Sequence, residues 1–535
     1  MIKEIKNKIE KLNVSYIAVI LFLFSFMFPI IFYNYSDLRG GDLAEYINNP
    51  LRVINGDMPY KDFWLIFPPL EVYYPTLLYS IFGVNMFVLF TSSWIFGALC
   101  TVFSFLIINK VTKKKTIAVI GALLIFLSGM ISNYSGFDYG GHIHLFFLLC
   151  ATYLFMSMKK DIKYLYIGLL IGIGAGFRID LSGAYYLAIL STIIYNKVKN
   201  RISYSELFKQ FLLMSLGCSI IFLAIYLPLV GSVGLDKLLN EILINPPKHA
   251  TAATVPFMKT VVDSAVNTIR EFGQVSLIST GLNIFRTIYD LSYQLFPLIV
   301  LGMFVYFFRK IRYIAESLIL FMFWALFTLP KALAVVDVHY LSVLNTILFF
   351  PFIIMLSSNW LSSSKTSRVI KTTLIIILAI LLVSVPASRA IDLVSFSKQP
   401  TLYVQGEVDG FSLKDENKRE EIQSVIDDIQ NNTQLGDYIF VSAWSAPPLY
   451  QMTGRNNPSY YDSVIDLGFS PSTEKQEGIC DSFREGDVKL IVTNNVCSFS
   501  WNGICFEDNF NIINSCIEQD YSLLSEYGQY SLYIR

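Results

Sequence analysis

Long apolar stretches separated by short polar gaps dominate the sequence up to residue 396. A window of about 19 residues, the length that spans a bilayer as a helix, finds apolar segments at 15–33, 84–109, 116–132, 143–158, 164–177, 181–195, 207–230, 292–308, 314–330, 338–357 and 372–388. The pattern predicts a polytopic α-helical membrane protein with about eleven transmembrane helices. If one pair of segments forms a re-entrant hairpin instead, the number of membrane crossings changes, but each gap stays on the same side of the membrane.

Basic residues fall in alternate gaps between these segments. The clusters are Lys3, Lys6, Lys8 and Lys11; Lys113, Lys114 and Lys115; Lys159, Lys160 and Lys163; Lys197, Lys199 and Arg201; Arg309, Lys310 and Arg312; and Lys365, Arg368 and Lys371. Short loops rich in lysine and arginine stay on the cytoplasmic side of a membrane, so this alternation predicts a cytoplasmic N-terminus. The other gaps, and everything after residue 388, are then predicted to be extracytoplasmic.

The composition agrees with this class of protein and excludes others. Hydrophobic residues make up 54% of the 535 residues and charged residues only 15%, against roughly 25% charged residues in soluble domains. Mean hydropathy is +0.51. The formal net charge is zero, so the overall balance predicts no nucleic-acid partner. The first apolar run lacks a small-residue cleavage site after it and is predicted to stay as an anchor in the cell membrane.

Residues 397–535 change character and contain no further spanning run. They include helix-like stretches at 416–430 and 508–518, strand-like runs at 438–442 and 488–493, and a terminal pair of short strands. This pattern predicts a small C-terminal extracytoplasmic α/β domain. The chain is thereby divided into a multi-pass membrane domain, residues 1–396, and an extracytoplasmic domain, residues 397–535.

Four of the seven cysteines lie in this tail: Cys480, Cys497, Cys505 and Cys516. On an oxidising face, four cysteines can form two disulfides in three possible pairings. A metal site would more often show a tight C-x-x-C spacing, which the tail lacks. Disulfides are therefore the favoured interpretation, and free thiols are the alternative if the exterior of the cell is reducing.

Charged and histidine side chains gather in every gap that is assigned to the outer face. They include Asp42, Glu45, Arg52, Asp62, Arg178, Asp180, Lys248, Lys331, Asp337 and His339. Ionised groups within the hydrocarbon cost about 2.5–3.5 kcal/mol on insertion scales, so they are usually functional or shielded. Each has a simpler interpretation when taken alone, such as a mutual ion pair of Arg178 and Asp180 in a tight turn, or a satisfied interfacial His339. Their confinement to one face instead predicts a shared site.

Three stretches resemble a known group of membrane enzymes. The strongest is the first outer loop, "GDLAEYINNPLRVINGDMPYKDFWLIFPPLEVYYPTLLYSIFG" (41–83), where an acidic residue and an arginine precede Gly-x-x-Pro-Tyr-x-Asp-Phe and a proline pair. The others are "FRIDLSGAYYLA" (177–188) and "PKALAVVDVHYLSVL" (330–344). Together they resemble the glycosyltransferase C superfamily, the group similar to protein O-mannosyltransferases and lipid A aminoarabinose transferases.

This resemblance implies a membrane glycosyltransferase that moves a sugar from a polyprenyl-phosphate donor to an acceptor in the cell envelope. The identity of the sugar stays open, as does the choice among lipid, polysaccharide and protein acceptors. The sequence departs from the family pattern at Lys331, where an arginine is common, and at Gly41 and Asp42, which stand in place of Asp-Glu. No nucleotide-phosphate loop is present, and the cytoplasmic gaps are too short for a nucleotide-sugar domain, so the predicted donor is lipid-linked.

The residue types suit this chemistry. An acceptor hydroxyl loses its proton as it attacks the anomeric carbon, and a carboxylate within hydrogen-bond reach accelerates such a step about 10²–10⁴-fold. Asp42 is the favoured base and Glu45 the alternative, while the competing interpretation makes Asp42 the cap of a helix that begins near Leu43. Cations stabilise the charge that grows on the departing lipid phosphate. The predicted donor-phosphate and substrate-binding residues are Arg52, Tyr60, Asp62, Arg178, Asp180, Lys248, Lys331, Asp337 and His339.

No cofactor and no metal ligand is predicted, and dependence on a divalent metal stays open. Two other function classes remain. A transporter or flippase of lipid-linked sugars often contains repeats and broken helices, and the Gly-rich "GLLIGIGAGF" (168–177) beside "LSGAYYLAIL" (181–190) fits a broken pair, although no second copy of this pair is present. An assembly subunit of an envelope polysaccharide machine, with the tail as its interaction module, fits the outer charges less well.

Overall fold

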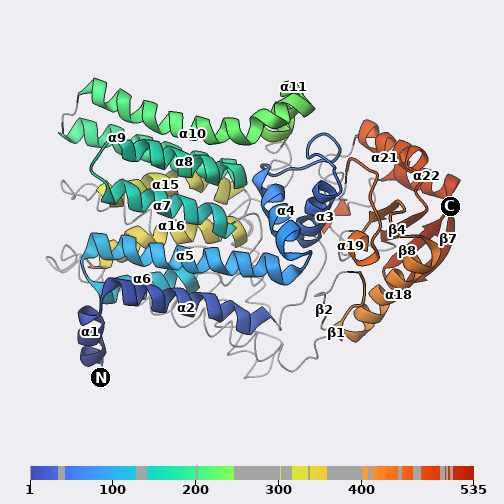
Figure 1. Cartoon of the computed structure of the whole chain (residues 1–535), viewed down its shortest axis with the longest axis horizontal. Coiled ribbons are helices and arrows are strands. Elements are labelled where there is room, and N and C mark those ends of the chain that lie inside the picture. Colours follow the sequence, from blue (N-terminus) through green and yellow to red (C-terminus); the bar gives the residue numbers. More distant parts are fainter. Residues whose placement is uncertain are drawn as a thin grey trace. The chain divides into compact units, whose positions relative to one another are not determined.

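The structure, a computed structural model, describes residues 2–33, 42–127, 141–200, 203–245, 302, 316–334, 338–357, 402–407, 412–413, 415–443, 449–461, 472–494, 500–501, 504–505 and 510–535. The chain divides into two compact units, whose helices and strands are labelled in Figure 1. Unit 1 comprises Met1–Tyr33, Ser92–Ala224 and Thr254–Ser395, and unit 2 comprises Asn34–Thr91, Ile225–Ala253 and Phe396–Arg535. The last segment of unit 2 begins at Phe396, one residue before the boundary predicted at 397, and this unit also contains residues 34–91 with the loop that the sequence analysis assigns to the outer face.

Unit 1 is built from helices. In the described residues these are α1 (Ile2–Lys11), α2 (Val14–Tyr33), α5 (Met86–Thr112), α6 (Lys115–Ile125), α7 (Gly141–Ser157), α8 (Ile162–Phe177), α9 (Ile179–Asn200), α10 (Tyr204–Val233), α15 (Glu316–Ala334) and α16 (Val338–Ser357). The first residues of α5 and the last residues of α10 belong to unit 2. From α2 onward, each coincides with one apolar segment predicted from the sequence. The segments predicted at 292–308 and 372–388 lie outside the described residues, so the number of crossings stays a prediction.

The apolar character of these helices extends to their outward faces. Among the described residues, two helices, Phe87–Thr112 and Tyr204–Val233, are long and apolar enough to cross a membrane by length and composition. Leu212, Leu216 and Leu223 of α10 are 50–56% exposed. Exposed apolar surface of this extent marks a face that contacts lipid or a partner rather than water, which supports the predicted membrane protein.

The glycines of α8 allow it to pack closely against α10. A Cβ on Gly168 would lie 2.0 Å from the carbonyl oxygen of Met214, and one on Gly172 would lie 2.7 Å from the Cβ of Ile221. Small residues four positions apart are a common device for close helix packing in membranes. The Gly-rich stretch is therefore a packing face of one continuous helix, Ile162–Phe177, and the chain breaks at Arg178 before α9 begins at Ile179.

The last segment of unit 2 contains the predicted α/β fold. A four-stranded sheet has the order β3-β4-β8-β7, with β3 at Ile439–Ser442, β4 at Leu490–Asn494, β7 at Ser522–Tyr527 and β8 at Tyr530–Ile534. β3 and β4 are parallel, whereas β8 is antiparallel to both β4 and β7. Two short pairs are β1 (Leu402–Tyr403) with β2 (Ser412–Leu413) and β5 (Ser500–Trp501) with β6 (Ile504–Cys505). The predicted small C-terminal sheet is thereby confirmed.

Helices accompany this sheet. The described ones are α18 (Glu416–Asn432), α19 (Leu449–Thr453), α21 (Thr473–Glu485) and α22 (Asn511–Asp520), of which α18 and α22 match predicted stretches. α18 begins where the Asp415 carboxylate accepts hydrogen bonds from the backbone N–H groups of Asn417 and Lys418. Its buried residues, Ile422, Val425, Ile426 and Ile429, follow the spacing of one helical face.

Other short elements belong to the earlier segments of unit 2. They are α3 (Asp42–Ile54), α4 (Leu70–Phe82), α11 (Leu235–Leu239) and the π-helical turn η3 (Asn240–Ile244). The sequence predicts the start of α3 near Leu43, and the structure places it at Asp42. α3 contains three of the predicted site residues, Asp42, Glu45 and Arg52.

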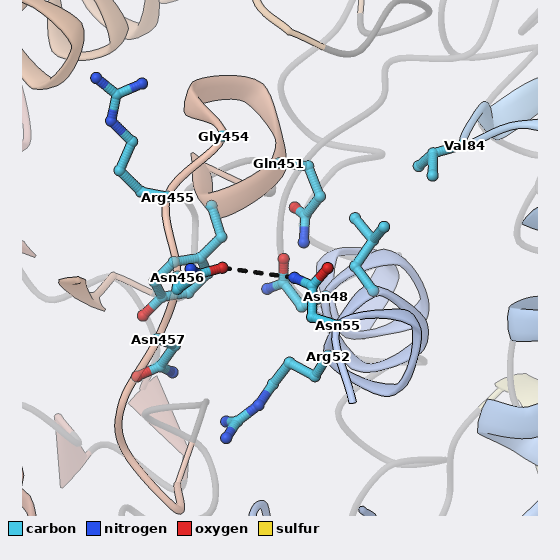
Figure 2. Close-up of a pocket in the computed structure, with 11 residues that line it drawn as sticks. Asn48, Arg52, Asn55, Val84, Gln451, Gly454, Arg455, Asn456 and Asn457 are labelled. Atoms are coloured by element: carbon cyan, nitrogen blue, oxygen red, sulfur yellow. Dashed lines mark hydrogen bonds between the residues drawn. The ribbon is translucent and has the colours of Figure 1, made fainter. Parts of the chain in front are cut away.

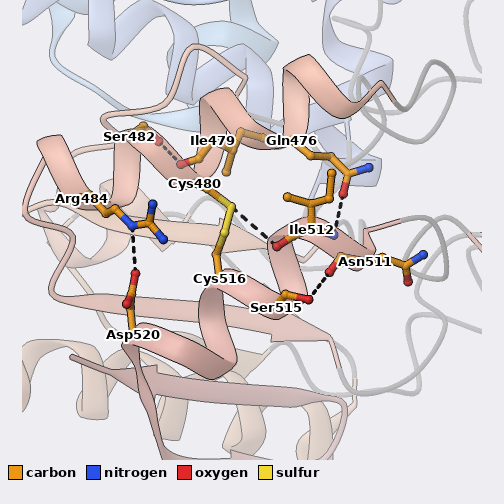
Figure 3. The surroundings of a disulfide bond; sticks show 10 residues. All are labelled: Gln476, Ile479, Cys480, Ser482, Arg484, Asn511, Ile512, Ser515, Cys516 and Asp520. Atoms are coloured by element: carbon orange, nitrogen blue, oxygen red, sulfur yellow. Dashed lines mark hydrogen bonds and ion pairs between the residues drawn. A yellow bond between two sulfur atoms is a disulfide. The ribbon is translucent and has the colours of Figure 1, made fainter.

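A disulfide joins α21 to α22 (Figure 3). It links Cys480 and Cys516, whose Cα atoms are 6.0 Å apart, and both cysteines belong to a buried apolar cluster. One disulfide among the four tail cysteines is therefore confirmed. Cys497 lies outside the described residues, and Cys505 is described only as part of the backbone of β6.

We expect the double variant Cys480→Ala/Cys516→Ala to unfold at a lower temperature than the oxidised wild type. The disulfide joins cysteines that are 36 residues apart, and in the chain-entropy model a loop of this length contributes about 4 kcal/mol to stability. Thermal unfolding of the purified protein measures the shift, with Cys150→Ala, which removes a cysteine outside the disulfide, as the control. Equal melting temperatures for the oxidised wild type and the double variant would contradict this stabilising role.

Candidate functional site

The first outer loop folds into two helices joined by a tight connection. α3 and α4 pack against each other, and the chain between them turns at Gly56 and Tyr60, whose φ angles are +106° and +66°. Glycine adopts such a φ at little cost, but at a tyrosine it is rare. The side chain of Tyr60 is anchored here, because its hydroxyl donates a hydrogen bond to the carbonyl of Phe67.

Arg52, in the last turn of α3, connects this loop to the C-terminal part of unit 2. Its Nε donates to Asp57 Oδ2 at 2.7 Å, and its two Nη atoms donate to the carbonyls of Asp62 at 3.0 Å and Ser459 at 2.8 Å. The guanidinium also lies 4.9 Å from the centroid of the Phe63 ring. These contacts make Arg52 an organiser of unit 2, whereas the sequence predicts that it binds the donor phosphate.

Tyr60 and Asp62 also shape the loop. Tyr60 is fully buried, and burial raises the pKa of its phenol well above the ordinary value, so the hydroxyl stays neutral. One carboxylate oxygen of Asp62 accepts a hydrogen bond from the backbone N–H of Met58 at 2.8 Å, a side-chain contact typical of turns. The Pro-Tyr-x-Asp-Phe motif therefore has a structural role in the fold of the loop.

A third segment of the chain completes this region. The indole N–H of Trp64 donates to the carboxylate of Glu241 in η3 at 3.0 Å, and the backbone N–H of Trp64 donates to the carbonyl of Tyr460 at 2.7 Å. The ammonium group of Lys237 in α11 lies 4.5 Å from the centroid of the Tyr460 ring. Trp64 and Tyr460 thus join three segments that are far apart in the sequence.

We expect Arg52→Ala to destabilise unit 2 by about 2–3 kcal/mol, because net contributions of hydrogen bonds from charged groups are about 1.5–3 kcal/mol and two carbonyl partners lose their donor. For a unit of this size the melting temperature would fall by about 4–12 °C, measurable by thermal unfolding of the purified protein. Lys61→Ala removes an exposed cation from the same loop and is the matched control. An unchanged melting temperature in Arg52→Ala would exclude this organising role.

A cavity of about 230 Å³ lies within unit 2, between α3 and the chain around α19 (Figure 2). Its lining consists of Asn48, Leu51, Arg52, Asn55, Val84, Tyr450, Gln451, Gly454, Arg455, Asn456 and Asn457. The side-chain amide of Asn55 donates to that of Asn456 at 3.5 Å. Apart from Arg52, these residues were not predicted as site residues, because uncharged amides give no electrostatic signal in a sequence. The one feature of the sequence that could have pointed to them is the polar run "RNNPSYY" (455–461) in the tail.

In unit 1, Arg178, Asp180 and Lys331 form an ion cluster. The guanidinium of Arg178 donates to both carboxylate oxygens of Asp180, at 3.2 and 3.1 Å, and the ammonium nitrogen of Lys331 lies 3.8 Å from Asp180 Oδ2. Arg178 is 6% exposed, whereas the side chains of Asp180 and Lys331 are 33% and 30% exposed. The mutual ion pair that was the simpler interpretation of Arg178 and Asp180 is present, and the structure adds Lys331 to it. These three side chains together carry a formal charge of +1, a sign that favours an anion.

The remaining predicted residues are described in part or not at all. Asp42 opens α3 and His339 lies in the first turn of α16, but their side chains lie outside the described parts, as do Lys248 and Asp337 entirely. Glu45 lies one turn along α3 and is partly buried. Among the described residues, no group of three or more metal-ligating side chains is present. The predicted catalytic roles and the predicted absence of a metal therefore stay predictions.

Comparison with known proteins shows a similarity of fold. No protein-family profile and no curated protein matches the chain. Among solved structures, ArnT from Cupriavidus metallidurans bound to undecaprenyl phosphate matches with a TM-score of 0.55 at 11% identity, over 97% of this chain and 97% of that chain. The apo state of that protein matches with a TM-score of 0.56 at 11% identity, over 96% of this chain and 97% of that chain. The chain therefore has the fold of ArnT, in agreement with the resemblance of the three motifs.

Proposed function

We propose that this chain is a membrane glycosyltransferase that moves a sugar from a polyprenyl-phosphate donor to an acceptor of the cell envelope. The observation that carries the proposal is the match to ArnT along 97% of both chains, because that neighbour is bound to undecaprenyl phosphate. Fold alone does not define an activity. The three motifs and the positive ion cluster support the same chemistry from the residues of this chain.

The proposed step is a displacement at the anomeric carbon of the donor. The acceptor hydroxyl oxygen forms a bond to this carbon while its proton passes to a carboxylate, Asp42 or Glu45. The bond between the anomeric carbon and the phosphate oxygen breaks, and the electron pair leaves with polyprenyl phosphate. Lys331, Arg178 and Lys248 are the proposed cations that stabilise the growing phosphate charge.

Asp180 has a separate role in this proposal. Its carboxylate contacts both cations of the cluster, with a bidentate contact to Arg178 and a longer one to Lys331. A bidentate pair fixes the orientation of a guanidinium. We therefore assign Asp180 as a positioning residue that holds Arg178, while the more exposed Lys331 is the better placed to meet a phosphate from solution.

The orientation in the membrane is part of the proposal, with the N-terminus cytoplasmic and the C-terminal domain outside. In a variant without Cys100, Cys150, Cys218, Cys497 and Cys505, single cysteines at positions 61 and 432 should react with a membrane-impermeant thiol reagent in intact cells. A cysteine at position 114 should react only after the membrane is permeabilised. All three positions are exposed, so the labelling depends on the side of the membrane on which each cysteine lies and not on its burial. Labelling of position 114 alone in intact cells would invert the orientation.

The decisive experiment follows the lipid product. Purified protein is incubated with undecaprenyl-phosphate sugars and a cell-envelope extract as the source of acceptor, and released undecaprenyl phosphate is measured. Acceptor-dependent release is the expected result. A flippase would move the intact donor across proteoliposomes without releasing the lipid phosphate, and an assembly subunit would do neither. Either of these outcomes would overturn the proposed transferase.

A further inference from the structure

The cavity in unit 2 has a lining whose chemistry differs from that of the ion cluster. It is formed by α3 on one side and by α19 with the residues after it on the other (Figure 2). Gly454, with φ at +67°, turns the chain after α19 and carries Asn456 into the lining. The glycine matters at this point, because a Cβ would meet the side chain of Leu435 at 2.6 Å.

Both arginines of the lining use their guanidinium groups within the protein. Arg52 donates to Asp57, Asp62 and Ser459, as described above. The Arg455 guanidinium donates to the hydroxyl of Thr433 at 2.8 Å and to nearby backbone carbonyls. In Figure 2 it points away from the gathered amide side chains. The cavity therefore offers no arginine fork to a phosphate or carboxylate.

Neutral amides are the polar groups that gather in the cavity. The side chains of Asn48, Asn55, Gln451 and Asn456 lie close together in Figure 2. Each amide has one carbonyl acceptor and two N–H donors, which is the combination that a sugar hydroxyl, itself donor and acceptor, can satisfy. The contact between Asn55 and Asn456 is long, 3.5 Å, so a ligand hydroxyl can replace it at small cost.

The size of the cavity narrows the class of ligand. Sites for drug-sized molecules have about 300–1,000 Å³, and this cavity has about 230 Å³. One sugar ring is suited to that space, whereas an oligosaccharide or a polyprenyl chain is too large. Leu51 and Val84 add apolar lining for the C–H face of such a ring.

We propose that this cavity binds one neutral sugar ring of a saccharide that carries no phosphate at that ring. A donor sugar is attached directly to its phosphate, for which the lining has no available guanidinium. Under the proposed glycosyltransferase function, the ring therefore belongs to the acceptor. This last assignment rests on the proposed function, whereas binding of a neutral sugar ring does not.

Saturation-transfer NMR on the full-length protein in detergent tests the binding. The probes are the methyl glycosides of glucose, galactose, mannose and N-acetylglucosamine, with glucuronate and methyl phosphate as charged comparisons whose C–H protons can be observed. We expect saturation transfer to at least one neutral glycoside and none to the charged probes. Transfer to no neutral glycoside, or to the charged probes alone, would overturn the proposal.

Two substitutions place the signal in this cavity. Asn55→Leu removes an exposed amide and fills the space with a branched side chain, and Asn48→Ala removes a second amide. Each should weaken glycoside binding at least tenfold, while Asn417→Ala, which removes an exposed asparagine at the start of α18, should leave it unchanged. Melting temperatures confirm folding of each variant. Equal binding by all three variants would place the saccharide elsewhere and overturn the proposal.

Competition with undecaprenyl phosphate separates acceptor from donor. A ring on the acceptor side should still bind when undecaprenyl phosphate is present in excess, and displacement by this lipid would overturn the acceptor assignment. Native mass spectrometry of undecaprenyl phosphate binding is measured in parallel. If the wild-type protein binds the glycoside but not undecaprenyl phosphate, the result counts against the proposed function alone. If it binds undecaprenyl phosphate but no glycoside, the result counts against the saccharide cavity alone.

Discussion

Asp42→Asn is expected to lower the rate of sugar transfer by about 10²–10⁴-fold, because an amide cannot accept the proton of the acceptor hydroxyl. The substitution keeps the size and shape of the side chain, and asparagine is itself a good residue at a helix start. α3 begins at Asp42, so folding should survive. Acceptor-dependent release of undecaprenyl phosphate measures the rate, and lipid binding by native mass spectrometry should be unchanged.

Glu45→Gln is the matched companion. The two residues are three positions apart, a spacing that shares one face of a helix, so both are candidates for the role. A large loss in Glu45→Gln alone would transfer the base to Glu45. Wild-type rates in both variants would leave these carboxylates as a helix start and exclude them from catalysis.

Lys331→Gln is the second substitution with a large expected effect, a fall in turnover of about 10²–10³-fold, the cost of removing one donor that stabilises a developing negative charge. The ammonium nitrogen lies 3.8 Å from Asp180 Oδ2, whereas Arg178 holds Asp180 through two hydrogen bonds of 3.2 and 3.1 Å, so we expect the bidentate Arg178–Asp180 pair to stay in place in this variant. Single-turnover transfer under saturating donor measures the chemical step. Lys331→Arg, which restores the residue common in the resembling family, should retain most of the activity.

Lys160→Gln controls for a general effect of charge. It removes an exposed lysine from a gap that the sequence assigns to the cytoplasmic side, and it should leave turnover unchanged. Small and equal effects of Lys331→Gln and Lys160→Gln would make the ion cluster a structural feature without a role in transfer.

The sequence predicts the helices of unit 1 and most of the C-terminal sheet, because the signals for these elements are local. The run of α10 is predominantly apolar after its first two turns, and the buried residues of α18 repeat at helical spacing. α21 was missed because its sequence, "TEKQEGICDSFRE", is mostly polar and buries only Gln476, Ile479, Cys480 and Phe483. The membership of the first outer loop in unit 2 could not be predicted either, since it depends on contacts between residues such as Arg52 and Ser459, which are 407 positions apart.

The candidate site, like the fold, was predicted only in part. Charge made Arg178, Asp180 and Lys331 visible, and the structure brings these three together. On the basis of its charge, Arg52 was also predicted to bind phosphate. In the structure its hydrogen bonds go to Asp57 and Asp62 in the loop and to Ser459 in the tail. A sequence does not distinguish these roles, because an arginine that binds carbonyls and one that binds phosphate have the same side chain. The amides of the cavity carry no charge and became apparent only through their proximity.

The assembly of unit 2 from distant segments has a consequence for the order of events during synthesis. Arg52 and Trp64 leave the ribosome long before Ser459 and Tyr460, whose carbonyls they bind. A separation of 407 residues corresponds to about 20–80 s at the usual elongation rate of about 5–20 residues per second. Throughout that interval the loop between α3 and α4 lacks its partners. A nascent chain that stalls before the tail therefore presents an incomplete loop, a feature that folding chaperones and proteases can detect.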